Sequence, residues 1–235
     1  MRLHTTSWGS GDRIALLVHG MMADHRTWRR VGPALAERGY RVIAVDLRGH
    51  GRSRRASGPE EYRPEDHADD LVETLPAGAE LAVGHSLGGL VLARALGRLA
   101  PARAVYSDPA WHLGAGPAGY RAELFVRGKS LTREQIRGFN PHWSDEDVDT
   151  EMASVRDWDE RSAFGLTGSV GADLWPARAE VPSLVTLADP STLVSPASAR
   201  MLEGRGFTVR TVEKAGHTIH RDDFEGFMSA LDGWI

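Results

Sequence analysis

The chain has 235 residues, and 41% of them are hydrophobic, which is enough for one domain with a sizeable core. Its 28 basic and 32 acidic residues are interspersed and give a net charge of −4, so the chain lacks the basic face expected of a nucleic-acid-binding protein. Cysteine is absent, which excludes disulfides and thiolate metal sites.

The amino-terminal residues 1–6 lack the apolar stretch that a signal peptide needs. No apolar run along the chain approaches the roughly 18 residues that a membrane span requires. We therefore expect a soluble, cytoplasmic protein that works without a membrane partner.

Strands and helices alternate over the first 107 residues. Strands are predicted at 3–8, 14–18, 42–45, 81–83 and 102–106, and helices at 26–38, 64–75 and 87–99. Continuous apolar strands such as 14–18 are typical of parallel strands that are buried on both faces. The alternation therefore predicts an α/β fold with a mostly parallel sheet and right-handed crossovers.

The pattern changes between residues 110 and 180, where no strand is predicted. Helix-like segments such as 145–157 predict a helical insertion there. Strands follow at 183–187 and 208–212, and helices at 196–204 and 222–234. We expect a core made of residues 1–109 and 181–235, with a small helical cap of residues 110–180 inserted into it.

The motif Gly84-x-Ser86-x-Gly88 lies between a predicted strand and a predicted helix. This arrangement is typical of a nucleophile elbow, a sharp turn that lifts a serine hydroxyl clear of the sheet. Such a turn has a strained backbone, and glycine neighbours have no Cβ to clash with it. The motif predicts that Ser86 is a catalytic nucleophile.

A serine nucleophile needs a base, which a carboxylate must orient. His217 is the best candidate for the base, because it follows a strand in a glycine-containing loop, and His220 is its nearby rival. The spacing of these two histidines differs from that of a zinc-binding helix, so no metal site is expected.

Four motifs follow one another along the chain: His19-Gly20, Asp46-x-Arg48-Gly49-x-Gly51-x-Ser53, Gly84-x-Ser86-x-Gly88-Gly89 and Gly216-His217. With these motifs the sequence resembles a capped α/β-hydrolase over nearly the whole chain outside the insertion. The resemblance implies a mostly parallel sheet of about eight strands with helices on both faces, and a triad in the order serine, acid, histidine. It also implies an oxyanion hole formed by the backbone N–H groups of Leu87 and Met21.

The acid of the triad has two candidates. Many α/β-hydrolases carry it after the strand predicted at 183–187, but Ser191 stands at that place here and Asp189 comes two residues early. A minority carry it one strand earlier, where Asp108 stands. We favour Asp108 and keep Asp189 as the alternative.

The substrate pocket is expected beside the oxyanion hole and under the insertion. Met22, Trp111, Trp143 and Trp158 are the candidates to line an apolar pocket, and packing within the cap is the other explanation for the tryptophans. Periodicity does not reveal the shape of such a pocket.

These features predict hydrolysis of a carboxylic ester, thioester or lactone of a small, largely apolar substrate through an acyl-enzyme intermediate. No cofactor is expected, and the pattern does not predict an oligomeric state. Epoxide hydrolases and haloalkane dehalogenases of this fold use an aspartate nucleophile, and the serine argues against their chemistry. Carbon–carbon bond hydrolysis, cofactor-free lyase chemistry and a non-catalytic small-ligand receptor remain alternatives on the same scaffold.

Overall fold

The computed structural model describes residues 1–115 and 119–235, and the described residues form one seven-stranded sheet. The strands are β1 (Thr5–Trp8), β2 (Arg13–Val18), β3 (Tyr40–Val45), β4 (Leu81–His85), β5 (Arg103–Ser107), β6 (Ser183–Leu187) and β7 (Thr208–Thr211). Their order is β1-β3-β2-β4-β5-β6-β7, and only the β1–β3 pair is antiparallel among these strands. The predicted α/β fold is confirmed, with seven strands in place of the eight that the resemblance implies.

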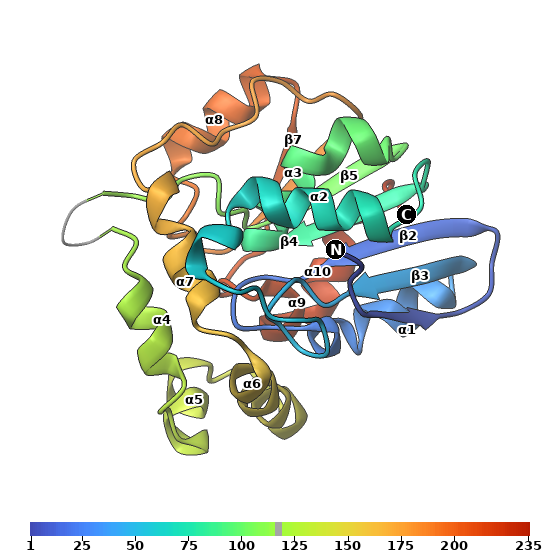
Figure 1. Ribbon diagram of the computed structural model, residues 1–235. Helices are drawn as coiled ribbons and strands as arrows, with labels where there is room; N and C mark the ends of the chain where they lie inside the picture. Colours follow the sequence, from blue (N-terminus) through green and yellow to red (C-terminus); the bar gives the residue numbers. More distant parts are fainter. Residues whose placement is uncertain (116–118) are drawn as a thin grey trace.

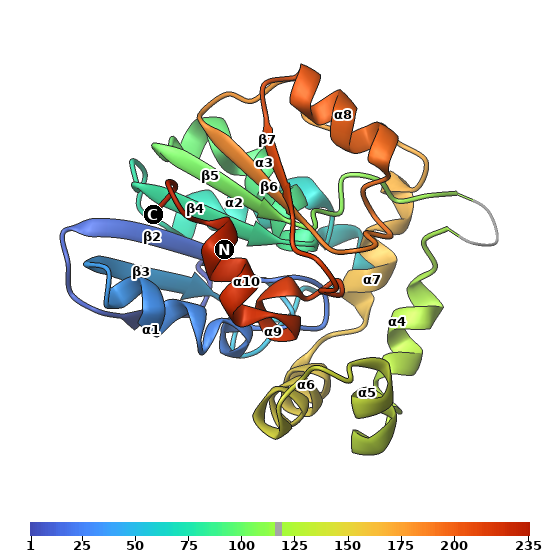
Figure 2. The same ribbon diagram turned by 180° about the vertical axis from the view of Figure 1, so that it is seen from behind.

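Helices cover both faces of the sheet (Figures 1 and 2). They are η1 (His25–Trp28), α1 (Val31–Ala36), η2 (Pro59–Glu61), α2 (Pro64–Thr74), α3 (Leu87–Leu99), α4 (Ala122–Gly128), α5 (Arg133–Phe139), α6 (Asp145–Asp157), α7 (Arg161–Gly165), η3 (Thr167–Ser169), α8 (Pro196–Gly204), α9 (Ile219–Asp222) and α10 (Phe224–Ala230). Helices α2, α3 and α8 contribute to one apolar core, which includes Leu71, Leu90 and Leu202. Helices α1 and α10 contribute Leu35 and Phe227 to the core on the other face.

The register of β4 and β5 brings two predicted site residues to the same edge of the sheet. His85 pairs with Ser107, so Ser86 and Asp108 are the next residues along two neighbouring parallel strands. The Ser86 N–H donates to the Ser107 carbonyl oxygen at 3.0 Å, which ties the two strand ends together. The carboxyl ends of parallel strands are where open α/β sheets bind ligands.

Two segments that were predicted as single helices are each divided. The segment 26–38 forms η1 and then α1, because Pro33 has no N–H to donate in the interior of one continuous helix, whereas it fits the first turn of α1. Of the segment 222–234, residue 222 ends α9 and only Phe224–Ala230 forms α10, because Asp223 leaves the helical conformation and its side chain accepts the Gly226 N–H at 2.9 Å to begin the new helix.

Between residues 110 and 180, where an inserted cap was expected, the described part of the chain contains helices and no strand. Helices α4, α5 and α6 lie together on one side of the sheet, at the lower left of Figure 1. The Arg29 side chain, which follows η1, donates to Asp147 of α6 at 2.6 Å, so an ion pair attaches this helix to the core.

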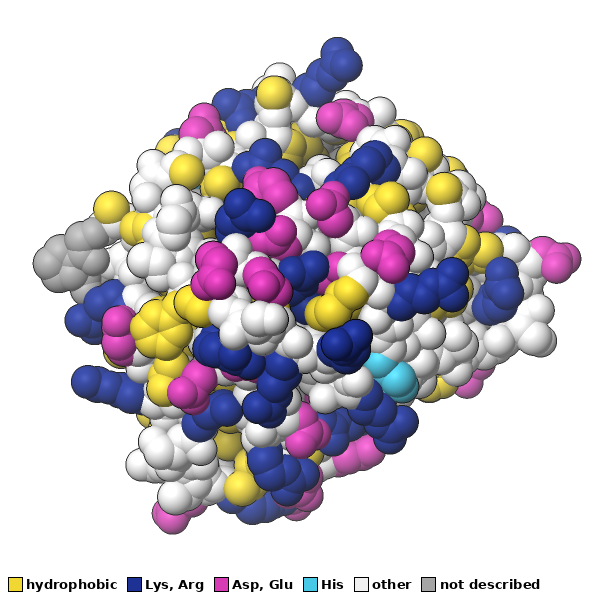
Figure 3. Space-filling model, in the orientation of Figure 1, with side chains coloured by type: hydrophobic (Ala, Val, Ile, Leu, Met, Phe, Trp, Pro, Cys, Tyr) yellow, Lys and Arg dark blue, Asp and Glu magenta, His cyan; other side chains and the backbone are white. Residues whose placement is uncertain are grey.

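The surface carries intermixed charges, and Lys or Arg side chains lie next to Asp or Glu side chains over the face in Figure 3. In the part of the chain that the structure describes, no helix has the length and apolar character needed to cross a bilayer.

Candidate active site

Ser86 lies on a strained turn between β4 and α3. Its backbone angles, φ 53° and ψ −117°, fall where residues with a side chain are rarely found, and the residue is only 8% exposed. A Cβ on Gly84 would come within 2.5 Å of the Gly88 carbonyl oxygen, and one on Gly88 within 2.3 Å of the Val18 carbonyl oxygen. The glycines of the motif are therefore required by close contact between backbones.

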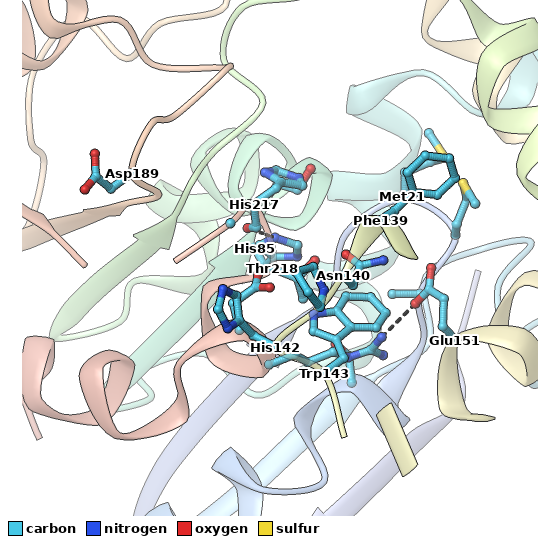
Figure 4. A pocket seen from close by; sticks show the side chains of 18 of the residues that line it. Met21, His85, Phe139, Asn140, His142, Trp143, Glu151, Asp189, His217 and Thr218 are labelled. Carbon is cyan, nitrogen blue, oxygen red and sulfur yellow. Dashed lines mark hydrogen bonds and ion pairs between the residues drawn. The ribbon is translucent and has the colours of Figure 1, made fainter. Parts of the chain in front are cut away.

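His217 is hydrogen-bonded to Asp108, whereas Asp189 borders the same cavity as His217 without a hydrogen bond to it. The His217 Nδ1–H donates to Asp108 Oδ2 at 2.6 Å, and the Asp108 side chain is fully buried. Asp189 instead accepts the backbone N–H of Lys214 at 3.2 Å, and Figure 4 shows its carboxylate turned away from His217. Because Nδ1 donates its proton to a carboxylate, the neutral imidazole keeps Nε2 free to accept another.

His220, the rival for the role of base, belongs to the core. Its Nε2 forms a 2.8 Å hydrogen bond with the Thr27 hydroxyl, and its ring stacks on Trp28 at 4.3 Å between centroids. Burial lowers the pKa of His220 well below its usual value, so this ring stays neutral.

His85 connects the elbow to the loop that carries His217. Its Nε2–H donates to the His217 carbonyl oxygen at 2.9 Å, and the two rings lie close together in Figure 4. Burial lowers the pKa of His85, so the ring remains a neutral donor as the pH falls. The contact fixes the His217 backbone beside the turn that carries Ser86.

The loop that is predicted to supply one oxyanion-hole donor, Met21, lies against Ser86. A Cβ on Gly20 would come within 3.0 Å of Ser86 Cβ, so the Gly20–Met21 loop approaches the serine as closely as glycine allows. The His19 ring holds this loop, because its Nδ1–H donates to the Gly20 carbonyl at 2.7 Å and its Nε2 accepts the Leu47 N–H at 2.9 Å. Among the described residues, neither the Met21 nor the Leu87 N–H donates to a backbone carbonyl.

Two cavities meet at Ser86 and His217. The first has a volume of about 280 Å³, and most of its walls are apolar. Its apolar walls include Met21, Leu113, Phe125, Leu166 and Leu193. The second has a volume of about 520 Å³ and is bordered by many polar side chains.

The second cavity lies under the segment that connects α5 and α6. The Arg221 side chain, which is 2% exposed, donates to Glu151 at 2.7 Å and lies 4.7 Å from the centre of the Trp143 ring. Burial raises the pKa of Asp222, which also lines this cavity. Figure 4 shows Trp143 and Glu151 on one side of the cavity and His217 on the other.

The four residues expected to line the substrate pocket differ in their positions relative to the two cavities at Ser86. Met22 and Trp143 border the larger cavity. Trp111 and Trp158 border neither cavity at Ser86, contrary to the expectation. The Trp111 indole is fully buried and donates to the Gly89 carbonyl at 3.3 Å, and the Trp158 indole donates to Ser162 at 2.6 Å, so both are packing residues.

Sequence reasoning missed several cavity residues. Phe125, Leu166 and Leu193, which border the smaller cavity, come from three different segments. The ion pair in the wall of the larger cavity joins Arg221 and Glu151, which are 70 residues apart in the sequence. No local pattern relates such residues, because only the folding of the insertion over the core brings them together.

One group of potential metal ligands is found among the described residues. It consists of His4, His25 and Asp46, whose donor atoms lie within 4.8 Å of one another. The Nδ1 atoms of His4 and His25 already lie 3.0 Å and 2.7 Å from the Asp46 carboxylate, so hydrogen bonds account for the arrangement. The carboxylate also accepts the Arg52 N–H at 2.9 Å, which is a structural role in the loop.

Comparisons with known proteins agree with this fold. Residues 15–230 match the family described as the alpha/beta hydrolase family. A stretch of 95 residues is 37% identical to bifunctional epoxide hydrolase 2 of Sus scrofa, and this match covers 39% of the chain but 17% of that protein. The chain spans less than a third of the length of each of the first four curated relatives, all of which are epoxide hydrolases.

Solved structures match over almost the whole chain. The N-formylmaleamic acid deformylase of Pseudomonas putida has a TM-score of 0.81 and 24% identity, and the match covers 98% of this chain and 95% of that one. An esterase of Exiguobacterium antarcticum has a TM-score of 0.79 and 18% identity, over 99% of this chain and 94% of that one. At these identities the likeness establishes a shared fold.

Proposed function

This chain belongs to the α/β-hydrolase family, and we propose that it is a serine hydrolase that cleaves a carboxylic ester, thioester or lactone of a small, largely apolar substrate. The reaction proceeds through an acyl-enzyme on Ser86, with His217 as the base and Asp108 as the acid. The observation that carries the proposal is the 2.6 Å hydrogen bond from His217 to Asp108, at the edge of the sheet where Ser86 stands.

Several curated relatives are epoxide hydrolases, but the elbow of this chain supports a different reaction. In enzymes of this fold, epoxide opening is expected to need an aspartate at the nucleophile position, and this chain has Ser86 there. A serine attacks a carbonyl carbon once a base removes its proton, which favours acyl transfer.

In the proposed mechanism, Ser86 Oγ attacks the carbonyl carbon while His217 Nε2 accepts its proton. Asp108 stabilises the imidazolium that forms and keeps Nδ1 protonated. The N–H groups of Leu87 and Met21 bind the oxyanion of the tetrahedral intermediate, and loss of one such donor typically costs about 3–4 kcal/mol. His217 then protonates the leaving group, and afterwards removes a proton from the water that releases the acyl group.

The two cavities suggest how a substrate lies. The apolar cavity of about 280 Å³ suits the acyl group, because apolar walls favour burial of a hydrocarbon chain. The larger cavity, with Glu151 and Arg221 in its walls, suits a more polar leaving group. This division predicts a preference for short acyl chains over long ones.

The proposal is tested with a fluorophosphonate probe and a series of p-nitrophenyl esters from acetate to decanoate. We expect Ser86 to be labelled, and Ser86→Ala to lose both labelling and turnover. Ser107→Ala is the matched control. Ser107 is a buried serine at the carboxyl end of β5, on the same edge of the sheet as Ser86, and its hydroxyl has no hydrogen-bond partner among the described residues. If Ser86 is neither labelled nor needed for turnover of any ester, the enzyme proposal fails, and the result favours the alternative of a non-catalytic small-ligand receptor.

A further inference from the structure

We propose that Ser191 is a positioning residue for the catalytic acid, which holds the Asp108 carboxylate in the orientation that its hydrogen bond with His217 requires. The inference rests on the proposed function. Its starting point is a 2.6 Å hydrogen bond from Ser191 Oγ to Asp108 Oδ1, the carboxylate oxygen that does not face His217.

The direction of this hydrogen bond follows from the other contacts of Ser191. Its Oγ accepts the backbone N–H of Leu193 at 3.2 Å and that of Val194 at 2.9 Å. A hydroxyl has one proton and two acceptor sites, and both acceptor sites are therefore occupied. The single proton of Ser191 points at Asp108, where an ionised carboxylate can only accept.

With this contact both oxygens of the buried carboxylate are occupied. Oδ1 accepts from Ser191, and Oδ2 accepts from His217. A carboxylate with one oxygen held from each side cannot rotate freely, so Oδ2 stays directed at Nδ1. Hydrogen bonds to charged groups are stronger than those between neutral groups. Removal of a hydrogen bond from a buried charge therefore destabilises the folded protein.

The same turn forms part of the wall of the acyl cavity. Thr192 and Leu193 border the cavity of about 280 Å³, and the Leu193 N–H donates to the Ser191 hydroxyl. Ser191 therefore joins the cavity wall to the acid through two consecutive hydrogen bonds. It stands in the loop after β6 and reaches an acid that follows β5.

The test compares Ser191→Ala, Ser191→Thr and Ser191→Val with wild-type enzyme. Threonine and valine have nearly the same shape, and only threonine keeps the hydroxyl. Ser195→Ala is the matched control, because this exposed serine in the same loop caps α8 and does not contact Asp108. The readouts are kcat and KM for a p-nitrophenyl ester, the acid limb of the pH profile of kcat/KM, and the far-downfield proton resonance of the His217 Nδ1–H.

We expect Ser191→Ala and Ser191→Val to lower kcat about tenfold, with KM within about twofold, which corresponds to about 1.4 kcal/mol. The acid limb of the kcat/KM profile moves to higher pH. Without the Ser191 hydroxyl, no hydrogen bond at Oδ1 offsets the negative charge of Asp108, so this charge stabilises the His217 imidazolium more strongly. The downfield resonance shifts or broadens, while Ser191→Thr and Ser195→Ala keep the wild-type behaviour.

Ser191→Val with wild-type kcat, acid limb and resonance would overturn the inference. Equal losses in Ser191→Thr and Ser191→Val would overturn it as well, because shape rather than the hydroxyl would then matter. The resonance is recorded without substrate, so it tests Ser191 even if the fluorophosphonate experiment rejects the proposed function.

Discussion

Replacing Asp108 by asparagine tests the proposed acid with almost no change in shape. Ser191 donates to Oδ1, so the amide oxygen of the variant is expected to face Ser191 and the NH₂ group to face His217. An NH₂ group at Nδ1 requires this nitrogen to be an acceptor, which moves the imidazole proton to Nε2. The ring would then present a proton to Ser86 and could not act as its base.

The size of the effect can be worked out from the geometry. The 2.6 Å hydrogen bond puts the charge centres of imidazolium and carboxylate about 4 Å apart, where an effective dielectric constant of about 20 gives about 4 kcal/mol. A loss of about 4 kcal/mol of transition-state stabilisation is a factor of about 10³ in rate. The wrong tautomer adds to this loss, and a comparable substitution in a serine protease triad costs about 10⁴. We therefore expect kcat/KM of Asp108→Asn to fall by about 10³ to 10⁴.

The assay is hydrolysis of p-nitrophenyl butyrate by purified variants, with thermal unfolding as the test of folding. Asp189→Asn is the matched control, and it should keep kcat/KM within about twofold because, among the described residues, the Asp189 carboxylate accepts only the Lys214 N–H. An Asp108→Asn enzyme with more than a tenth of wild-type activity would refute the reasoning. A collapse of Asp189→Asn would instead transfer the role to the alternative acid.

Two further predictions concern packing and pH. Gly88→Ala places a Cβ 2.3 Å from the Val18 carbonyl oxygen, so the turn that carries Ser86 must move. We therefore expect fluorophosphonate labelling of Ser86 to slow about 100-fold. The control is Gly97→Ala in the same helix, whose Cβ would have no contact closer than 3.6 Å and which should be labelled at the wild-type rate. Burial lowers the pKa of His67 well below 6.5, so the folded state keeps this ring neutral while the unfolded chain gains a proton as the pH falls through 6.5. Stability is then lost toward acid pH, and His67→Leu should reduce the slope of the unfolding free energy against pH by up to about 1.4 kcal/mol per unit in urea titrations. The exposed control His112→Leu should keep the wild-type slope, and equal slopes in both variants would contradict the argument.

Elements with a strong local pattern were predictable to the residue. Helix α3 covers 87–99 as expected, because an apolar helical face follows a turn that glycine marks. Helix α6 likewise covers 145–157, where Ser144 begins it by accepting the Asp147 N–H. Local backbone preference and local capping determine both elements, so the sequence alone contains the information.

Choices between distant partners were harder to predict. Asp108 and Asp189 both follow strands and both precede proline, and nothing local distinguishes them. The parallel register of β4 and β5 and the path of the His217 loop place Asp108 against His217. The tryptophans illustrate the same limit, because Trp111 and Trp143 have the same residue type but one is packed in the core and the other borders a cavity.

The register of β4 and β5 has a consequence for how this enzyme could diversify. The proposed nucleophile and acid belong to one contiguous stretch of 81–109, and the pairing of His85 with Ser107 sets their separation. The helical segment that we propose to be an inserted cap starts only after this stretch, at residue 110. Replacement of the insertion by one of another length would therefore change which molecules are admitted and leave the spacing of Ser86 and Asp108 untouched. Such a replacement would alter the cavity walls that come from 110–180, such as Phe125 and Leu166, and would keep those that come from the rest of the chain, such as Leu193.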